Sequence, residues 1–287
     1  MEIKNLKKVA DRIKKAIKYK ERIILYGDAD LDGSTSVIIL KESIKNLGGQ
    51  VACVYFPDRE SEGYGITRIA LEKLAKYKPA LFVALDCGIA NFKEVKQAKD
   101  MGFEGVIIDH HEVLDKLPPA DIIVDPKQKG DKYPFKNLAT AGIAFKLAEL
   151  LLAKKLTDSL RRNFLELAAL ATLADMMPLQ EDNEKIVEEG LSYLETSWRP
   201  GLRVLLDLEQ IQDLGLREKV SKIISFLNVR ETENGAPACF ISLTMTDKDE
   251  AKEFAEKLFE KSIERKQVVK SIVEQVKLKN DFNNPSP

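Results

Sequence analysis

Short apolar runs alternate with stretches of helical periodicity in the first half of the chain. The apolar runs occupy residues 22–28, 51–57, 80–88, 104–111 and 121–126. Helix-like stretches lie between them, near residues 34–47, 65–77 and 91–101. Strands that alternate with crossover helices indicate a parallel α/β sheet. The runs lack polar alternation, as expected for strands that are covered on both faces.

The pattern changes after about residue 138. The segments LATAGIAFKLAELLLAKK and RRNFLELAALATLADMM predict long apolar helices, and a mixed region follows over residues 182–250. The next segment predicts one or two charged amphipathic helices, with Thr246 or Asp247 as the N-cap. The final residues, DFNNPSP, predict a frayed tail.

Three aspartates follow the first apolar run in the stretch LYGDADLDGST, residues 25–35. Asp28, Asp30 and Asp32 stand at alternate positions. Alternate residues of an extended segment point the same way, so these carboxylates would crowd one place. Such crowding indicates either a bound cation or a solvated loop.

Other strand ends also carry acids, namely Asp86, Asp109 and Asp125. A single aspartate at a strand end is common, because this residue favours turns and helix N-caps. In open α/β sheets, however, ligands bind outside the carboxyl ends of the strands. Acids at four strand ends are therefore expected to converge on one functional edge.

The chain has two histidines, His110 and His111, and they are adjacent. On a strand they would point to opposite sides, so at most one needs to bind a metal directly. Carboxylates with imidazole suit Mn²⁺ or Mg²⁺ better than a thiolate zinc site. Two ions roughly 3.5–4 Å apart would neutralise this many acids. The alternative is a surface turn with two solvated imidazoles.

Composition narrows the remaining choices. The formal net charge is -1, so a nucleic-acid surface has to be a local patch. Three cysteines without C-x-x-C spacing favour a reducing compartment, and we expect a cytoplasmic protein. No apolar run approaches the ~20 residues of a membrane span. Neither a P-loop nor a G-x-G-x-x-G motif is present, and EGYGI predicts a flexible loop over the strand edge.

The chain resembles the DHH phosphoesterase superfamily in four motifs, in their order and spacing: GDADLDG, ALDCG, DHHE and TLADMMPL. Further segments resemble RecJ-type single-strand exonucleases: YGDADLDGSTS, IVDPKQ, ATAGIAFKLAELL and LADMMPLQEDN. The resemblance covers roughly residues 20–185 and continues more weakly beyond them. It implies a parallel-sheet DHH catalytic domain over 1–185, a helical or mixed extension over 186–250, and a connecting helix with a frayed tail over 251–287.

The resemblance implies metal ligands at Asp28, Asp30, Asp32, Asp86, His110 and Asp175, with Asp86 between two ions. It implies that His111 contacts the scissile phosphate or assists proton transfer, with Asp109 beside the metal ligands. Asp125 matches no ligand of the family and is expected in a turn or a supporting contact. The sequence alone would not rank Asp175 above Glu166 or Asp182.

Candidate phosphate contacts are less distinct. The family's N-A-A-G-R stretch, whose arginine contacts the terminal phosphate, corresponds to LNVRETENG with altered spacing, so Arg230 is the nearest match. The segment DPKQKGDKYPFK, Arg161 and Arg162 offer further positive charge, and solvated surface charge is an equal alternative for them.

The chain also departs from RecJ-type enzymes, which have a second, DHH-associated domain after the connecting helix. No Gly-Gly pair follows Gly49 and no histidine follows His111. Three explanations stay open: a fragment, a minimal version, or a second lobe from another protein.

The expected activity is a two-metal phosphodiesterase that degrades single-stranded DNA or RNA from one end, 5′ to 3′. Replication or repair proteins are further candidate partners, and no membrane partner is expected. One alternative activity is cleavage of short oligoribonucleotides or cyclic dinucleotides. The alternative from another class is a non-catalytic scaffold of a replication complex, which usually loses motif acids.

Overall fold

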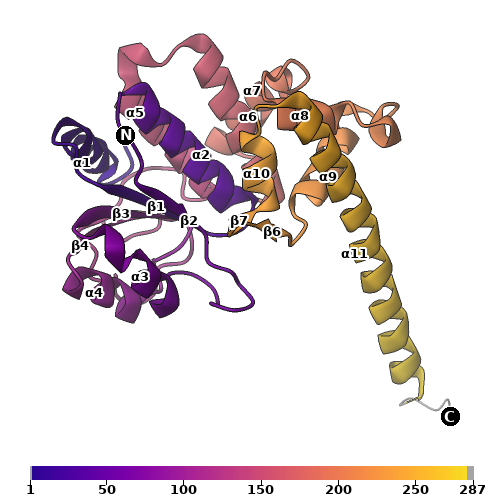
Figure 1. The fold of residues 1–287 in the computed structure, drawn as a ribbon, viewed down its shortest axis with the longest axis horizontal. Coiled ribbons are helices and arrows are strands. Elements are labelled where there is room, and N and C mark those ends of the chain that lie inside the picture. The colour runs from indigo at the N-terminus through magenta and orange to yellow at the C-terminus, as the bar shows by residue number, and fades with distance from the viewer. Residues whose placement is uncertain (1, 283–287) are drawn as a thin grey trace.

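A five-stranded parallel sheet forms the centre of the N-terminal part of the protein, as the apolar runs predict (Figure 1). The computed structural model describes residues 2–282, and side chains as far as residue 276. The sheet order is β2-β1-β3-β4-β5. The strands are β1 (Ile23–Gly27), β2 (Cys53–Tyr55), β3 (Ala80–Leu85), β4 (Phe103–Ile108) and β5 (Ile122–Val124). All four neighbouring pairs are parallel, so their carboxyl ends share one edge.

Helices cover both faces of the sheet (Figure 1). One face is covered by α1 (Leu6–Lys18), α2 (Leu31–Asn46) and α5 (Thr140–Leu152). The other face is covered by α3 (Arg68–Leu74) and α4 (Phe92–Asp100). Short 3-10 turns follow α3 at Ala75–Tyr77 and α5 at Ala153–Lys155. Side chains of β1 alternate between the two cores: Ile23 and Leu25 enter the first, whereas Ile24 and Tyr26 enter the second.

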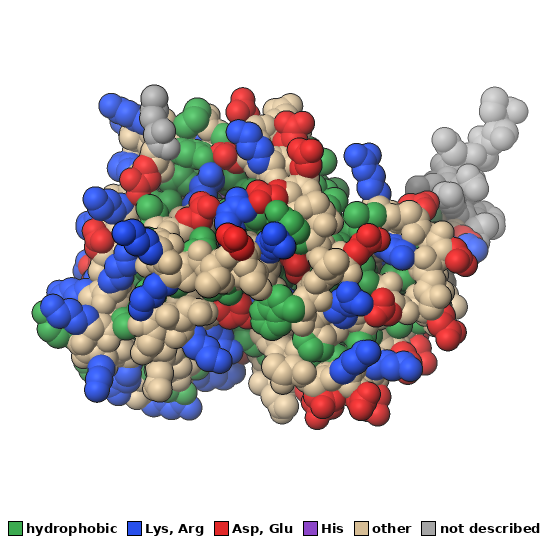
Figure 2. Space-filling model, turned by 90° about the horizontal axis from the view of Figure 1, so that it is seen from above, with side chains coloured by type: hydrophobic (Ala, Val, Ile, Leu, Met, Phe, Trp, Pro, Cys, Tyr) green, Lys and Arg blue, Asp and Glu red, His purple; other side chains and the backbone are tan. Residues whose placement is uncertain are grey.

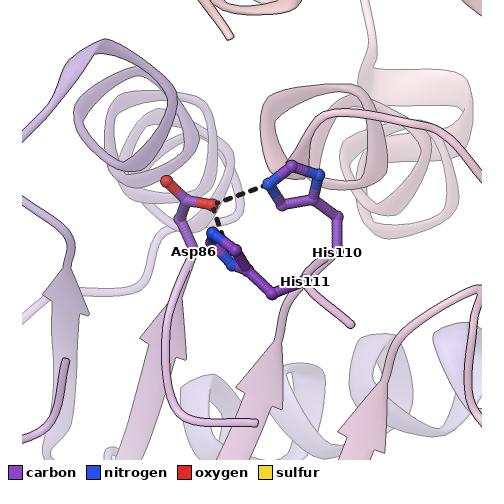
Figure 3. Close-up of side chains that lie close together, drawn as sticks. All are labelled: Asp86, His110 and His111. Carbon is purple, nitrogen blue, oxygen red and sulfur yellow. Dashed lines mark ion pairs between the residues drawn. The ribbon is translucent and has the colours of Figure 1, made fainter. Parts of the chain in front are cut away.

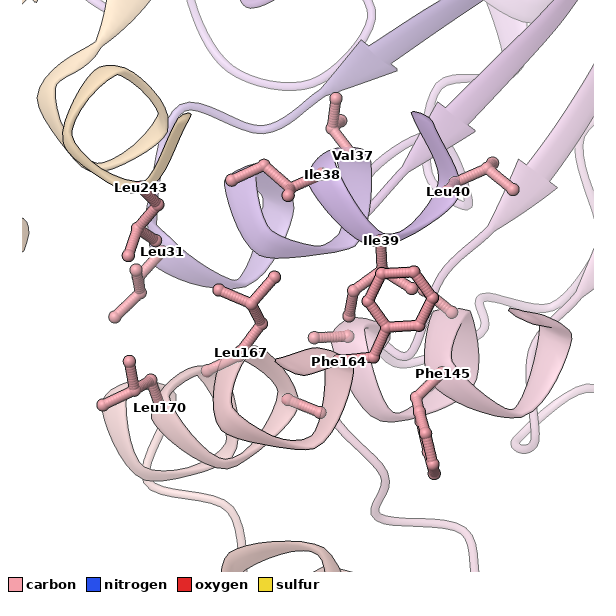
Figure 4. Packing of buried hydrophobic residues seen from close by; sticks show 14 of the residues in the cluster. Leu31, Val37, Ile38, Ile39, Leu40, Phe145, Phe164, Leu167, Leu170 and Leu243 are labelled. Carbon is pink, nitrogen blue, oxygen red and sulfur yellow. The ribbon is translucent and has the colours of Figure 1, made fainter. Parts of the chain in front are cut away.

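A helical region packs on the outer side of α2 and α5. It contains α6 (Asp158–Ala174), α7 (Glu181–Leu194), α8 (Pro200–Leu206), a 3-10 turn (Glu209–Ile211), α9 (Leu216–Leu227), a hairpin of β6 (Thr232–Glu233) and β7 (Ala236–Pro237), and α10 (Ala238–Thr244). Figure 4 shows Leu167 and Phe164 of α6 facing the buried side chains of α2. The first core is therefore continuous from the sheet into the helical region, which fixes α6 relative to the strand ends.

The last element is one long helix, α11 (Lys248–Phe282), which extends away from the rest of the fold (Figure 1). Asp247 caps it, because its Oδ1 accepts the backbone N–H groups of Asp249 at 2.9 Å and Glu250 at 3.0 Å. The predicted cap is thus confirmed. Of the predicted tail, residues 283–287 lie outside the described residues. Within the described part of the chain, no helix combines the length and the apolar character that crossing a membrane requires.

The predicted division at residues 185/186 and 250/251 stays a prediction. The first of these boundaries falls inside α7, and the second falls inside α11.

Candidate metal centre

The first aspartate motif does not continue as an extended segment. Asp30 is the N-cap of α2, and its Oδ1 accepts the backbone N–H of Gly33 at 3.0 Å. The helix begins at Leu31, three residues before the predicted start, so Asp32 lies in its first turn. The expectation of alternating extended residues is therefore wrong. A Cβ at Gly33 would lie 2.3 Å from the backbone oxygen of Asp28, which explains the glycine of the motif.

Asp32 is buried and caps a second helix. Its two carboxylate oxygens accept the backbone N–H groups of Thr140 and Ala141, each at 2.7 Å. These groups lie in the first turn of α5, whose own N-cap residue, Ala139, has no capping side chain. Burial raises the pKa of Asp32 to about 8. The same carboxylate thus serves the stability of α5 and the acidic cluster.

Asp86 follows β3 directly and lies in the middle of the cluster. Its φ is 63°, a left-handed conformation that aspartate adopts more readily than most residues. Its Oδ1 accepts the hydroxyl of Thr140 at 3.0 Å and lies 3.4 Å from His110 Nε2. Burial, and then the charge of Asp32, raise its pKa well above the ordinary value. A cation beside Asp86 would therefore strongly favour the ionised form of its carboxyl group.

Both histidines lie beyond the end of β4, and both turn toward Asp86 (Figure 3). Their ring centroids are 4.6 Å apart. The expectation that they point to opposite sides is wrong, because neither residue belongs to the strand. Burial, together with the positive charge of His111, lowers the pKa of His110 to about 4. The neutral imidazole that results is the form that binds metals.

His111 is oriented by Asp109. Its Nδ1 lies 2.7 Å from Asp109 Oδ1, which also accepts the backbone N–H groups of His110 and His111. The hydrogen bond to Asp109 raises the pKa of His111 to about 9. Burial alone would raise the pKa of Asp109, but its bond to His111 holds that pKa below the ordinary value. Asp109 therefore orients the His111 ring and also holds the backbone of both histidines.

Asp175 joins the cluster from the C-cap of α6. Its Oδ2 lies 3.4 Å from His110 Nε2. Glu166 and Asp182, which the sequence alone ranks equally with Asp175, have other partners. Glu166 accepts a hydrogen bond from Ser197 Oγ at 2.6 Å, and Asp182 lies 3.3 Å from Lys146 Nζ. Of these three acids, Asp175 is the one whose carboxylate lies beside His110.

The ligand atoms fall into three overlapping groups, each with its atoms within 4.8 Å of one another. The groups are Asp86–His110–His111, Asp32–His110–Asp175 and Asp28–Asp30–Asp86. Asp86 and His110 each belong to two of them, which suits a carboxylate shared between two ions. The Nδ1 atom of His110 is buried and has no hydrogen-bond partner within the described residues. Oxygen-rich ligands with imidazole fit Mn²⁺ or Mg²⁺.

Arg59, in the loop after β2, is a site residue that sequence reasoning missed. Its Nη2 lies 2.8 Å from Asp28 Oδ2 and 2.8 Å from Asp30 Oδ2. Its guanidinium also stacks over the ring of Tyr64, 5.1 Å from the centroid. The sequence could have indicated Arg59 through its position, because it follows closely the carboxyl end of a predicted strand of the same sheet.

Two hydrogen bonds hold the loop that contains Tyr64 against the rest of the fold. The Tyr26 hydroxyl donates to the backbone oxygen of Gly65 at 2.8 Å, and Asn91 Oδ1 accepts the N–H of Ile66 at 3.1 Å. The predicted flexible loop over the strand edge therefore has fixed anchors. The Tyr64 side chain itself is exposed.

A cleft of about 390 Å³ opens above Asp30, Asp32 and Asp175. Arg59 and Tyr64 line one part of it, and Arg230 and Arg265 line another. The structure thus brings Arg230 to the same cleft as the acids.

Arg161 does not lie at this cleft. It belongs to the first turns of α6, whereas Asp175 caps the other end, about 20 Å away along the helix axis. Arg161 forms an ion pair with Glu189 and stacks over the ring of Phe145. Its neighbour Arg162 stacks over the ring of Tyr193. The structure thus does not bring Arg161 to the cleft, and a substrate contact there stays a prediction. A local charge pattern in the sequence does not reveal that an acid of another helix, Glu189, lies beside this arginine.

Asp125, at the end of β5, is fully buried. Its Oδ1 accepts the N–H of Lys127 at 2.7 Å, which forms the expected turn. Burial raises its pKa to about 7. It belongs to none of the three ligand groups.

This fold and this set of acids define a class of protein. The family described as DHH family, N-terminal domain, matches residues 22–172, which is more than half of the chain. The chain therefore belongs to the DHH family. Within it, the chain is 39% identical over 280 residues to the single-stranded-DNA-specific exonuclease RecJ of Bacillus subtilis, covering 96% of this chain and 34% of that protein. It is 34% identical over 208 residues to RecJ of Thermus thermophilus, covering 71% of this chain and 30% of that protein.

Solved structures agree with this relationship. A crystal structure of exonuclease RecJ bound to manganese matches with a TM-score of 0.84 and 27% identity, over 96% of this chain and 70% of that chain. RecJ from Thermus thermophilus in complex with Mn²⁺ matches with a TM-score of 0.80 and 25% identity, over 96% of this chain and 40% of that chain. The chain spans about a third of the length of the curated relatives it matches.

Proposed function

We propose that the chain is a two-metal phosphodiesterase that hydrolyses single-stranded nucleic acid from one end, 5′ to 3′. The observation that supports this most is the overlap of three ligand groups at Asp86 and His110. Two Mn²⁺ or Mg²⁺ ions would be held by Asp28, Asp30, Asp32, Asp86, His110 and Asp175. Such ions acidify water and offset the charge of a phosphate during hydrolysis.

The chain's own residues orient this centre. Thr140 holds Asp86 through its hydroxyl and Asp32 through its backbone N–H. Asp109 holds His111 through Nδ1, which leaves Nε2 free to face a substrate. Because the pKa of His111 lies above neutrality, its imidazolium can donate a proton or a hydrogen bond to a phosphoryl oxygen.

The cleft supplies contacts for a strand. Arg230 and Arg265 offer positive charge to phosphates, and the exposed ring of Tyr64 offers a face on which a base can stack. A base that stacks in this way is unpaired, so single strands are the expected substrate. We extend to this chain the single-stranded DNA named for its relatives and include single-stranded RNA. Replication or repair proteins are the partner class we propose, in the cytoplasm.

Digestion of end-labelled substrates tests the proposal. The panel contains single-stranded DNA, single-stranded RNA, duplex DNA and a cyclic dinucleotide, each with Mn²⁺ and with chelator. We expect single strands to be shortened from the 5′ end in Mn²⁺ only. Undiminished cleavage after exhaustive metal removal would refute the metal assignment. Cleavage of the cyclic dinucleotide alone would favour the alternative activity, and inactivity toward the whole panel would favour a scaffold.

A further inference from the structure

The exposed face of α1 concentrates positive charge away from the metal centre. The exposed residues of α1 are Lys7, Lys8, Asp11, Lys14, Lys15 and Lys18. We call its five lysines the α1 strip. The whole chain has a net charge of -1, so this excess is local. Figure 2 shows Lys and Arg side chains gathered over the half of the molecule that contains α1, and acidic side chains gathered at the opposite end.

The α1 strip keeps most of its positive charge, because Asp11 is the single acid among the exposed residues of α1. Among the described residues, no lysine of the strip forms an ion pair, whereas Arg12 of the same helix pairs with Glu21 and Glu104. The apolar face of α1 is buried in the core through Leu6, Val9 and Ile13. It is therefore not available to enter a membrane surface, which an interfacial helix requires.

Two hydrogen bonds connect the strip, and Lys4 just before α1, to neighbouring elements. Lys14 Nζ donates to the backbone oxygen of Leu150 at 2.9 Å, and the exposed Lys154 and Lys155 follow in the turn after α5. At the other end of α1, Lys4 Nζ donates to the backbone oxygen of Lys129 at 2.8 Å. Residue 129 lies in the loop after β5, which leaves the same sheet edge as the metal centre.

An exposed aromatic ring ends the strip. Tyr19 is the C-cap of α1, is 62% exposed, and has Lys18 Nζ 5.5 Å from its ring centroid. Sites for single-stranded nucleic acid combine lysines that follow the phosphates with aromatic rings on which bases stack. A surface for acidic protein segments would need the charges but not the ring.

We propose that the α1 strip and Tyr19 form a second binding surface for single-stranded nucleic acid, outside the cleft. The substrate class rests on the proposed function. In the sheet order, β5 is at the opposite end from β2, whose following loop contributes Arg59 and Tyr64 to the cleft. The strip therefore holds a part of a long strand that the cleft does not reach.

Binding in chelator tests this proposal without relying on cleavage. The variant Lys7→Gln/Lys8→Gln/Lys14→Gln/Lys15→Gln is titrated with labelled single-stranded DNA of about 4 and about 30 nucleotides. We expect weaker binding of the long strand only. Its salt slope should fall by roughly 0.7 for each phosphate that the variant no longer neutralises, so by up to roughly 3. The matched control replaces four exposed or partly exposed lysines elsewhere, Lys219, Lys222, Lys252 and Lys257, and should bind like the wild type.

A second variant separates stacking from charge. Tyr19→Ala should weaken binding of the long strand without changing the salt slope, and Tyr19→Phe should restore it. Equal long-strand affinity in the strip variant and its control would overturn the proposal, and so would an unaltered affinity in Tyr19→Ala. If the strip variant and Tyr19→Ala weaken long-strand binding as expected but the wild-type chain cleaves none of the test substrates, the proposed function is refuted and the proposed binding surface is not.

Discussion

Asp86 lies in an unfavourable place for a negative charge. It is buried, surrounded by other acids, and its pKa is raised well above the ordinary value. A carboxyl with a raised pKa in the folded state lowers stability above that pKa, and this cost disappears as the pH falls toward the ordinary value. A cation beside Asp86, as we propose, would offset this cost.

Replacing Asp86 by asparagine should separate function from stability. We expect Asp86→Asn to lower kcat by at least about 100-fold, because a shared ligand is removed. In chelator at pH 8 the variant should melt at or above the wild-type temperature, since one buried charge is gone. This advantage should shrink as the pH is lowered, because the wild-type carboxyl then takes up a proton. A melting temperature far below wild type would instead make Asp86 a structural residue.

The pair of His111 and Asp109 gives a pH-dependent signal. The bond to Asp109 raises the pKa of His111 to about 9, so it contributes stability that is complete below the ordinary pKa of about 6.5 and is lost as the pH rises through about 9. Asp109→Asn should move the pKa of His111 down toward 6.5. NMR titration of the imidazole resonances in chelator measures this. Glu112→Gln, which removes an exposed neighbouring acid paired with Lys127, should leave the pKa near 9.

At the scale of elements, the strands were predictable and the turns after them were not. Continuous apolar runs between helical stretches are sufficient to predict a covered parallel sheet, and each predicted strand is present. The start of α2 at Leu31 was not predicted. Asp30 caps this helix by accepting the N–H of Gly33, and the sequence does not distinguish a capping aspartate from one that binds a metal or lies in a loop. For the same reason His110 and His111 were placed on a strand that ends at Ile108.

The contact between α2 and α5 predicts different effects for two neighbouring acids. Asp32→Ala removes the acceptor for two buried N–H groups at the start of α5, whereas Asp86→Ala removes the acceptor of one hydroxyl. An unpaired buried donor or the removal of an N-cap costs about 1–2 kcal/mol. Denaturant unfolding in chelator should therefore show Asp32→Ala less stable than Asp86→Ala by about that amount. Equal stabilities would contradict the capping role.

At the scale of the whole molecule, the site depends on how distant segments pack. The packing of α6 against the rest of the fold, α2 included, brings Asp175 to His110, and no periodicity in the sequence distinguishes Asp175 from Glu166. Arg59 and Arg230 are 171 residues apart along the chain, yet both line the cleft. The ligand motifs and Arg230 could be found from the sequence, whereas Arg59 and Tyr64 could be assigned to the cleft only from the fold.

The pinned loop at the cleft gives a prediction about substrate binding. Tyr64→Ala should weaken binding of single-stranded DNA by about 1–3 kcal/mol, the usual contribution of one stacked base. Tyr64→Phe keeps the ring and should bind like the wild type. Fluorescence anisotropy in chelator measures both. The decrease in affinity should be the same for long and short strands, unlike that of the α1 strip variant.

The number of Mn²⁺ ions bound per chain tests the central claim most directly. Free Mn²⁺ gives a strong electron paramagnetic resonance signal, so bound ions are counted from the decrease of that signal during a titration. The account predicts two ions per chain for the wild type, and fewer, more weakly held ions for Asp86→Asn. A control at a surface acid, Asp121→Asn, should keep two. A wild-type chain that binds no Mn²⁺, or an Asp86→Asn variant that binds two ions as tightly as the wild type, would contradict the two-metal centre.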